Sequence, residues 1–250
     1  MCDFFEIDSV EDEPRLAHAA RKSTKGSLTP LQKAWLFRVR HLAKAVWASE
    51  FSTRNFSQCL AALSLMRRNR EDIRRVPQVL AEHGIRLVIV ELFPTTKIDG
   101  VTLWLNKQSP VVALSFRYDR LDWFWHTLAH EMMHIKKRDG FSEPILDTDL
   151  VGEDADQLSE SERFIDSAAC DFLIPQKDIN KFIARTGPYY SKQQISLFAE
   201  RLKVHPGIIV GQLQHRKEMS YAYNREMLPK VLSIISSSAL TDGWGNVAPI

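Results

Sequence analysis

The five residues from His130 to His134 have the types and the spacing that metal-assisted hydrolysis needs. They form the pattern His-Glu-x-x-His, and in a helix this spacing places both imidazoles on one face, where they can bind a single zinc ion. Glu131 then lies beside the metal-bound water and can act as its base. The residues on both sides of the motif are apolar. This disfavours the alternative of two surface histidines, because buried imidazoles and a buried glutamate need a partner.

A catalytic zinc ion also needs a third protein ligand and an open coordination position. The downstream Gly and third His of one class of zinc peptidases are missing from the sequence, which favours a carboxylate. Glu162 is the preferred candidate, and Asp166 follows it by one helical turn, where it could accept the second ring N–H of a ligating histidine. However, Ser159-x-x-Glu162 is also a capping box, in which Glu162 would only satisfy a helix start. Weaker candidates for the ligand are Glu153, Asp156 and Glu160.

Peptide hydrolysis at such a site would use Glu131 to take a proton from water and return it to the leaving amine. A donor that stabilises the oxyanion would also be needed. Side-chain chemistry alone suggests four residues near the C-terminal end, each of which could equally be structural: Tyr189, Tyr190, His205 and His215.

The elements that position these residues follow from hydrophobic periodicity. Apolar residues at helical spacing predict three helices between residues 31 and 81, and His83-Gly84 ends this region. Three short β-branched or alternating runs then predict strands at 86–90, 97–105 and 110–115. Asp99-Gly100 is a turn signal at the start of the second run, which favours a hairpin.

A helix that begins near Asp119 or Asp122 and continues through Ile135 is predicted to carry the motif, with further helices at about 160–173, 192–202 and 207–215. Residues 147–160 are acidic and predict a mobile surface loop. We therefore expect an α+β fold in which a sheet of about three strands packs on the motif helix. The expected organisation is an irregular lead-in (1–30), a helical region (31–84), the zinc metallopeptidase core (85–186) and a C-terminal helical region packed on it (187–250), without a readable pattern in 236–250.

The 250 residues have the composition of a globular protein and a formal net charge of +2, which is too small to indicate nucleic-acid binding. Cys2, Cys59 and Cys170 are far apart and form neither a disulfide framework nor a Cys-x-x-Cys zinc site. The N-terminus lacks the pattern of a secretory signal, and no run approaches the roughly 20 apolar residues of a membrane helix. We expect a cytoplasmic protein that does not contact membranes.

Three blocks of the sequence resemble the ImmA/IrrE family of metallopeptidases. The first, residues 119–134, contains the motif, and the second, residues 162–175, reads Glu-x-x-Ile-Asp-x-Ala-Ala where the family has Glu-x-x-Ala-Asn-x-Phe-Ala. The third, residues 204–215, is similar to the C-terminal helix of a subset related to HigA-type antitoxin regulators. The resemblance covers roughly residues 85–216, and Ile165 and Ala168 depart from the family pattern without affecting the ligand.

The resemblance implies a zincin-like core of the gluzincin type, in which His130, His134 and Glu162 hold Zn²⁺ and Glu131 is catalytic. It also implies an endopeptidase that acts on a protein substrate, such as a transcriptional repressor. Some relatives carry an N-terminal helix-turn-helix domain, which we expect this chain to lack.

One alternative is a regulatory or antitoxin-like protein that keeps the zinc site, performs little proteolysis and contacts DNA. The helices at 192–202 and 207–215 could form a helix-turn-helix, although the apolar second helix suits core packing better. A basic patch could arise from a cluster of arginines, for which a solvated helix face is the simpler interpretation: Arg67, Arg68, Arg70, Arg74 and Arg75. A purely structural zinc site is disfavoured because it would not need Glu131 as a base.

Overall fold

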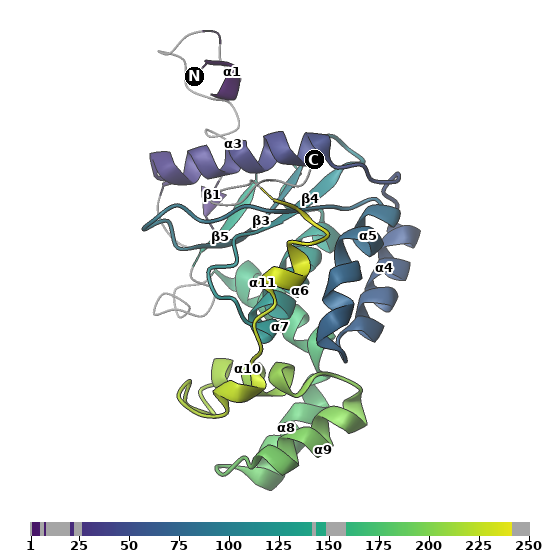
Figure 1. Cartoon of the computed structure of the whole chain (residues 1–250), viewed down its shortest axis with the longest axis vertical. Coiled ribbons are helices and arrows are strands. Elements are labelled where there is room, and N and C mark those ends of the chain that lie inside the picture. The colour runs from purple at the N-terminus through teal and green to yellow at the C-terminus, as the bar shows by residue number, and fades with distance from the viewer. Residues whose placement is uncertain are drawn as a thin grey trace.

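The structure, a computed structural model, describes residues 2–5, 8, 21–22, 27–141, 144–148 and 159–241. They form the predicted α+β fold, with helices on both faces of a small mixed sheet (Figure 1). The α-helices in these residues are α1 (Cys2–Phe5), α3 (Pro30–Ala45), α4 (Thr53–Met66), α5 (Val76–Glu82), α6 (Leu121–Lys137), α7 (Glu160–Leu173), α8 (Gln176–Thr186), α9 (Lys192–Leu202), α10 (Pro206–His215) and α11 (Leu232–Ile235). Short 3-10 helices are η1 (Arg70–Arg75) and η3 (Arg225–Met227).

The sheet has the strand order β1-β5-β3-β4-β2-β6. Its strands are β1 (Arg21–Lys22), β2 (Arg86–Ile89), β3 (Ile98–Trp104), β4 (Pro110–Leu114), β5 (Ile145–Thr148) and β6 (Leu240–Thr241). Strand β3 pairs antiparallel with β4 and β5, and the other pairs are parallel. The three predicted strands are confirmed as β2, β3 and β4. Strands β1, β5 and β6 were not predicted, because two to four residues are too few to show a period.

Two details of the sheet correct the sequence prediction. Asp99 and Gly100 lie within β3 and not in a turn, although β3 and β4 do pair as a hairpin. Gly100 leaves room for Glu131, since a Cβ atom there would lie 2.3 Å from Glu131 Oε1 and would force that side chain or the strand to shift. The start of the predicted acidic loop, Asp147 and Thr148, belongs to β5, while residues 149–158 lie outside the described part of the chain.

The two faces of the sheet pack against different helices. Alternate strand residues such as Val88 and Val101 face α3, and residues such as Leu87 and Val112 face the larger core that includes α6. In Figure 1, α3 crosses one face of the sheet and α6 and α7 lie on the other. Because α6 is covered on all sides, every residue from Leu121 to Ile135 is buried. The chemistry of the motif therefore takes place in the protein interior.

The predicted helices that flank the core are confirmed as α3, α7, α9 and α10. Helix α10 buries its apolar residues, including Ile208, Ile209 and Leu213, in the same core as α6. These side chains are thus used for packing, as the apolar sequence of this helix indicated. Among the described residues, no helix combines the length and apolar character that crossing a membrane requires.

Candidate metal centre

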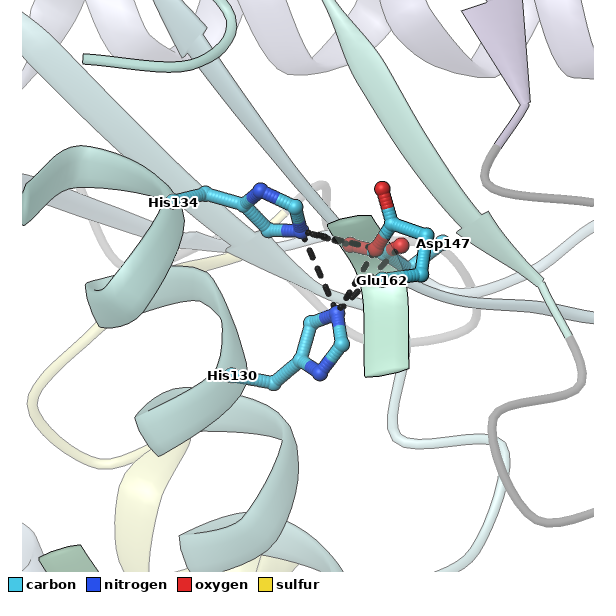
Figure 2. Close-up of side chains that lie close together, drawn as sticks. All are labelled: His130, His134, Asp147 and Glu162. Atoms are coloured by element: carbon cyan, nitrogen blue, oxygen red, sulfur yellow. Dashed lines mark hydrogen bonds and ion pairs between the residues drawn. The ribbon is translucent and has the colours of Figure 1, made fainter. Parts of the chain in front are cut away.

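Helix α6 brings the two motif histidines together. His130 and His134 are one turn apart and fully buried, and their Nε2 atoms lie 3.2 Å from each other (Figure 2). The helix continues without interruption from Leu121 to Lys137 and ends where Arg138 takes a left-handed conformation. The predicted i, i+4 geometry of the pair is therefore present, and both ring nitrogens point at the same place.

Glu162 reaches this place from helix α7. Its Oε2 atom lies 3.6 Å from His130 Nε2 and 3.4 Å from His134 Nε2. Its backbone N–H donates a hydrogen bond to Ser159 Oγ, which caps α7. Only the Ser159 half of the predicted capping box is present among the described residues, because the Glu162 carboxylate lies at the two histidines and not at the helix start.

Asp147, which the sequence interpretation missed, is the fourth member of the cluster. It lies on β5, is fully buried, and places Oδ1 3.5 Å from His130 Nε2 and Oδ2 3.5 Å from His134 Nε2 (Figure 2). Neither oxygen has a hydrogen-bond partner among the described residues. The only signal in the sequence was an acid after the apolar pair Ile145-Leu146, and the acidic residues that follow hid the short strand.

Together the four side chains form a group that can hold a metal ion. The atoms that face one another are separated by 3.2 to 3.6 Å in each measured pair. Two ligand atoms that each lie at the usual zinc distance of about 2.0 to 2.2 Å are about 3.3 to 3.6 Å apart in a tetrahedral site, so these separations are compatible with a shared ion. Buried carboxylates without hydrogen bonds also need a cation. The residues therefore fit a metal ion.

The charges in the cluster depend on one another. Burial opposes ionisation of Asp147, but His130 and His134 hold the pKa of its carboxyl far below the usual range. Burial likewise opposes protonation of His134, but Asp147 and Asp139 raise the pKa of its imidazole to about 12. Burial and the neighbouring Asp147 raise the pKa of Glu131 well above its usual value. The carboxylates of Asp147 and Glu162 thus favour positive charge beside them, which either protons on the imidazoles or one bound cation could supply.

Strand β3 positions Glu131, the proposed base. Thr102 Oγ1 donates a hydrogen bond of 2.7 Å to Glu131 Oε2, and Glu131 Oε1 occupies the space beside Gly100. Gly100 and Thr102 are two residues apart, so they lie on the same face of the strand. Asp147 is the residue of β5 that pairs with Gly100. Gly100, Thr102 and Asp147 are therefore neighbours in the sheet, and all three face the motif helix.

The partner of His134 is Asp139 and not Asp166. Asp139 Oδ2 lies 3.1 Å from His134 Nδ1, whereas Asp166 Oδ1 lies 3.2 Å from Nε2 of His126, a residue outside the motif. The prediction that Asp166 contacts a ligating histidine was therefore wrong. Glu162 lies beside His130 and His134, while Asp166, one turn later on α7, lies beside a residue one turn earlier on α6. The two helices thus run antiparallel, a fact that no local pattern contains.

Three of the four proposed oxyanion donors are exposed or have partners outside the cluster. Tyr189 is 86% exposed, Tyr190 donates a hydrogen bond to Glu218, and His205 caps α10 by accepting from the backbone of Gly207. His215 is the exception, because its Nε2 atom lies 3.8 Å from Asp166 Oδ2. It also lines a cavity with neighbours from α6 and α10: Arg120, Asp122, Trp123, His126, Ile208 and Gln212.

The rival ligands and the arginine cluster contribute nothing to this group in the described residues. Glu160 is exposed at the start of α7, and Glu153 and Asp156 lie outside the described residues. Arg67 donates hydrogen bonds to the carbonyls of Phe172 and Leu173 at the end of α7. The other four arginines are partly or fully exposed, and Arg70 also donates to the carbonyl of Lys230. The cluster is thus partly engaged in holding η1 and α4 to the rest of the fold.

Comparison of the chain with protein-family models, curated proteins and solved structures gave no match. What the centre can do is therefore inferred from its own side chains. These are two imidazoles and two carboxylates that converge in the interior, and a third carboxylate, Glu131, that the sheet holds beside them.

Proposed function

We propose that this protein is a zinc-dependent metallo-endopeptidase with a zincin-like core of the gluzincin type. The observation that carries the proposal is the position of Glu131, a buried carboxylate held by Thr102 directly beside a group of converging metal ligands. A site that only stabilised the fold would not need a base at this position. Two imidazoles among the ligands favour zinc over magnesium or calcium, which take oxygen ligands.

His130, His134 and Glu162 would hold the ion, and Asp139 would keep the His134 ring in the orientation that points Nε2 inward. When bound, zinc polarises a peptide carbonyl and lowers the pKa of a coordinated water toward about 7. Glu131 would take the proton of the attacking water and deliver it to the nitrogen of the leaving amine. The hydrogen bond from Thr102 Oγ1 holds the Glu131 carboxylate in place for this exchange.

The substrate that we propose is a regulatory protein such as a transcriptional repressor. The support for this step is the resemblance of residues 119–134, 162–175 and 204–215 to the ImmA/IrrE family. The buried centre gives a second reason, since a peptide must enter as an extended segment to reach it, and loosely structured segments of regulators can do so.

The first prediction concerns Glu131→Gln. This change keeps the side-chain volume and the ligands, so we expect unchanged zinc content and a loss of peptide hydrolysis on the order of 10²- to 10⁴-fold. The substrate can be a peptide library made from a digested cell extract, in which mass spectrometry counts new N-termini. Glu160→Ala, an exposed acid at the start of α7, is the control and should cleave like the wild type. Equal cleavage by zinc-loaded Glu131→Gln would overturn the assignment of the base.

One observation favours a second candidate function. Asp147 supplies a fourth possible ligand, and structural zinc sites are closed by four protein ligands. The alternative is therefore a regulatory or antitoxin-like protein that keeps zinc, performs little proteolysis and contacts DNA. A zinc-loaded wild type that produces no new N-termini in the peptide library, and that shifts DNA in a salt-sensitive manner, would favour this alternative.

A further inference from the structure

Asp147 adds a fourth possible protein ligand to a centre whose proposed reaction needs one position for water. In a centre with three protein ligands, the water lies between the metal and the base. Here the carboxylate of Asp147 lies 3.5 Å from each ligating imidazole, and Asp147 pairs across the sheet with Gly100, the residue beside Glu131 Oε1. The same residue is thus next to the ligand pair and near the base.

The fold fixes Asp147 in this place from two directions. Its strand neighbour Leu146 packs in the core under α3, so the alternation of side chains along β5 turns Asp147 to the opposite face, toward α6. Its pairing partner on β3 is Gly100, whose missing side chain leaves the space that Glu131 fills. Neither oxygen has a hydrogen-bond partner among the described residues, and the nearest partners are the two imidazole nitrogens at 3.5 Å, so a cation shared with these imidazoles would suit the carboxylate.

Two protonated histidines would be a poor substitute for that cation. The Nε2 atoms of His130 and His134 lie 3.2 Å apart, and two positive rings at this distance repel each other. One divalent ion instead satisfies both imidazoles and both carboxylates. With Asp147 and Glu162 as ligands, the two negative charges cancel the charge of the ion, which weakens it as a Lewis acid compared with a site that has one carboxylate and a water.

From this geometry we infer that Asp147 is a displaceable fourth ligand, which closes the metal centre at rest and must leave before water or a peptide carbonyl can bind. The inference rests on the proposed function and adds to it a mode of regulation: the resting enzyme is latent because its own carboxylate fills the open position. The inference also reconciles four possible protein ligands with a catalytic site. The centre would have four protein ligands at rest and three during peptide hydrolysis.

The test uses the full chain loaded with cobalt(II), whose visible absorption bands report the ligands around the ion, and inorganic azide as the probe of an open position. We expect azide to change the spectrum of the wild type only weakly. In Asp147→Ala, azide should bind on the order of tenfold more tightly or better, because a site open a tenth of the time binds about ten times more weakly than one always open. The wild type and Asp147→Ala should each retain one cobalt per chain.

Three further variants complete the comparison. Asp147→Asn keeps the side-chain volume and should change azide affinity in the same direction, which guards against a folding defect in Asp147→Ala. Asp178→Ala, a change in the first turn of α8, is the control and should behave like the wild type. Glu162→Ala shows how much metal is lost when a permanent ligand is removed.

Either of two results would overturn the inference. Equal azide affinity in the wild type and both Asp147 variants would mean that the position is already open. Loss of cobalt from Asp147→Ala to the level of Glu162→Ala would mean that Asp147 is a permanent ligand. A wild type that binds neither cobalt nor zinc would instead contradict the proposed function itself. The cobalt spectra do not depend on peptide cleavage. The azide titration therefore tests the role of Asp147 even if the protein shows no peptidase activity.

Discussion

Single residues outside the ligand set determine how the ligands point. Asp139 holds Nδ1 of His134, and this contact leaves Nε2 of the same ring for the cluster. By contrast, Nδ1 of His130 is buried and has no hydrogen-bond partner among the described residues. The orientation of His130 therefore depends on packing within α6, while that of His134 depends on a polar contact that can be removed separately.

We predict that Asp139→Asn weakens zinc binding by about 10- to 100-fold, which is the usual effect of removing the carboxylate partner of a ligating histidine. The measurement is competition with a chromophoric zinc chelator. The fold should persist, because Asp139 is partly exposed. Asp178→Ala serves as the control for loss of a surface acid. Unchanged zinc affinity in Asp139→Asn would show that Asp139 does not orient the ligand.

His215 allows a prediction about pH. Burial and the nearby His126 lower the pKa of the His215 imidazole to about 4 in the folded protein, below the usual value of about 6.5 in an unfolded chain. Between these values the unfolded chain binds a proton that the folded chain does not, so the contribution of His215 to stability is complete above about pH 6.5 and decreases as the pH falls toward 4.

We therefore expect His215→Gln to lose less stability than the wild type when the pH is lowered from 7.5 to 5. Urea unfolding followed by circular dichroism at several pH values measures the difference between the two proteins. Taking this difference removes the titrations that both proteins share. An identical loss of stability in both proteins would contradict the assigned direction of the pKa shift.

At the scale of elements, the centre is assembled where strands β3 and β5 meet helices α6 and α7. The strands supply Asp147 and the residues that hold Glu131, and the helices supply the other ligands. At Gly100 the sheet lies close to α6, because a Cβ atom there would meet side chains of Thr127 and Glu131. The separation of β3 and α6 thus sets the position of the base independently of the ligands.

For this reason we predict that Gly100→Ala impairs hydrolysis more than zinc binding. The new methyl group would lie 2.3 Å from Glu131 Oε1, so Glu131 or the strand must move, and a displacement of about 1 Å can reduce the rate on the order of 100-fold. Zinc content and cleavage of the peptide library should be measured on the same preparation. Zinc loss as severe as in Glu162→Ala would mean that the strand positions the ligands as well.

How much of this site the sequence predicts depends on the range of the contacts involved. His130, Glu131 and His134 follow from helical spacing alone, and Glu162 follows from a second helix start together with the resemblance. Asp147 required the pairing of β5 with β3, which joins residues more than 40 positions apart, and a four-residue strand carries no period from which to predict that pairing. The partner of Asp166 required the relative direction of two helices, which only the assembled core determines.

At the scale of the whole molecule, the metal would connect elements that are distant along the chain. Its ligands come from α6, β5 and α7, and the buried core around them includes side chains from Phe51 to Ala239. Removal of the ion would leave carboxylates buried without partners, which destabilises the folded state.

We predict that a chelator lowers the thermal unfolding temperature and that added zinc restores it. At free zinc about 1,000 times the dissociation constant, the ion stabilises the folded state by about 4 kcal/mol. Differential scanning calorimetry with and without chelator measures the effect. Glu131→Gln, which leaves the ligands intact, should respond like the wild type. An unfolding temperature that does not change after complete metal removal would contradict the proposed centre.

The pair His126 and Asp166 has a consequence for how the protein acquires its ion. This contact joins α6 to α7 one turn away from the cluster, and it needs only a proton, since Asp166 raises the pKa of His126 despite the burial that opposes it. The two helices are therefore fastened to each other whether or not an ion is bound. We expect the protein to fold first and to bind or release its ion afterwards. The metal concentration around the protein would then determine what fraction of the molecules carries an ion.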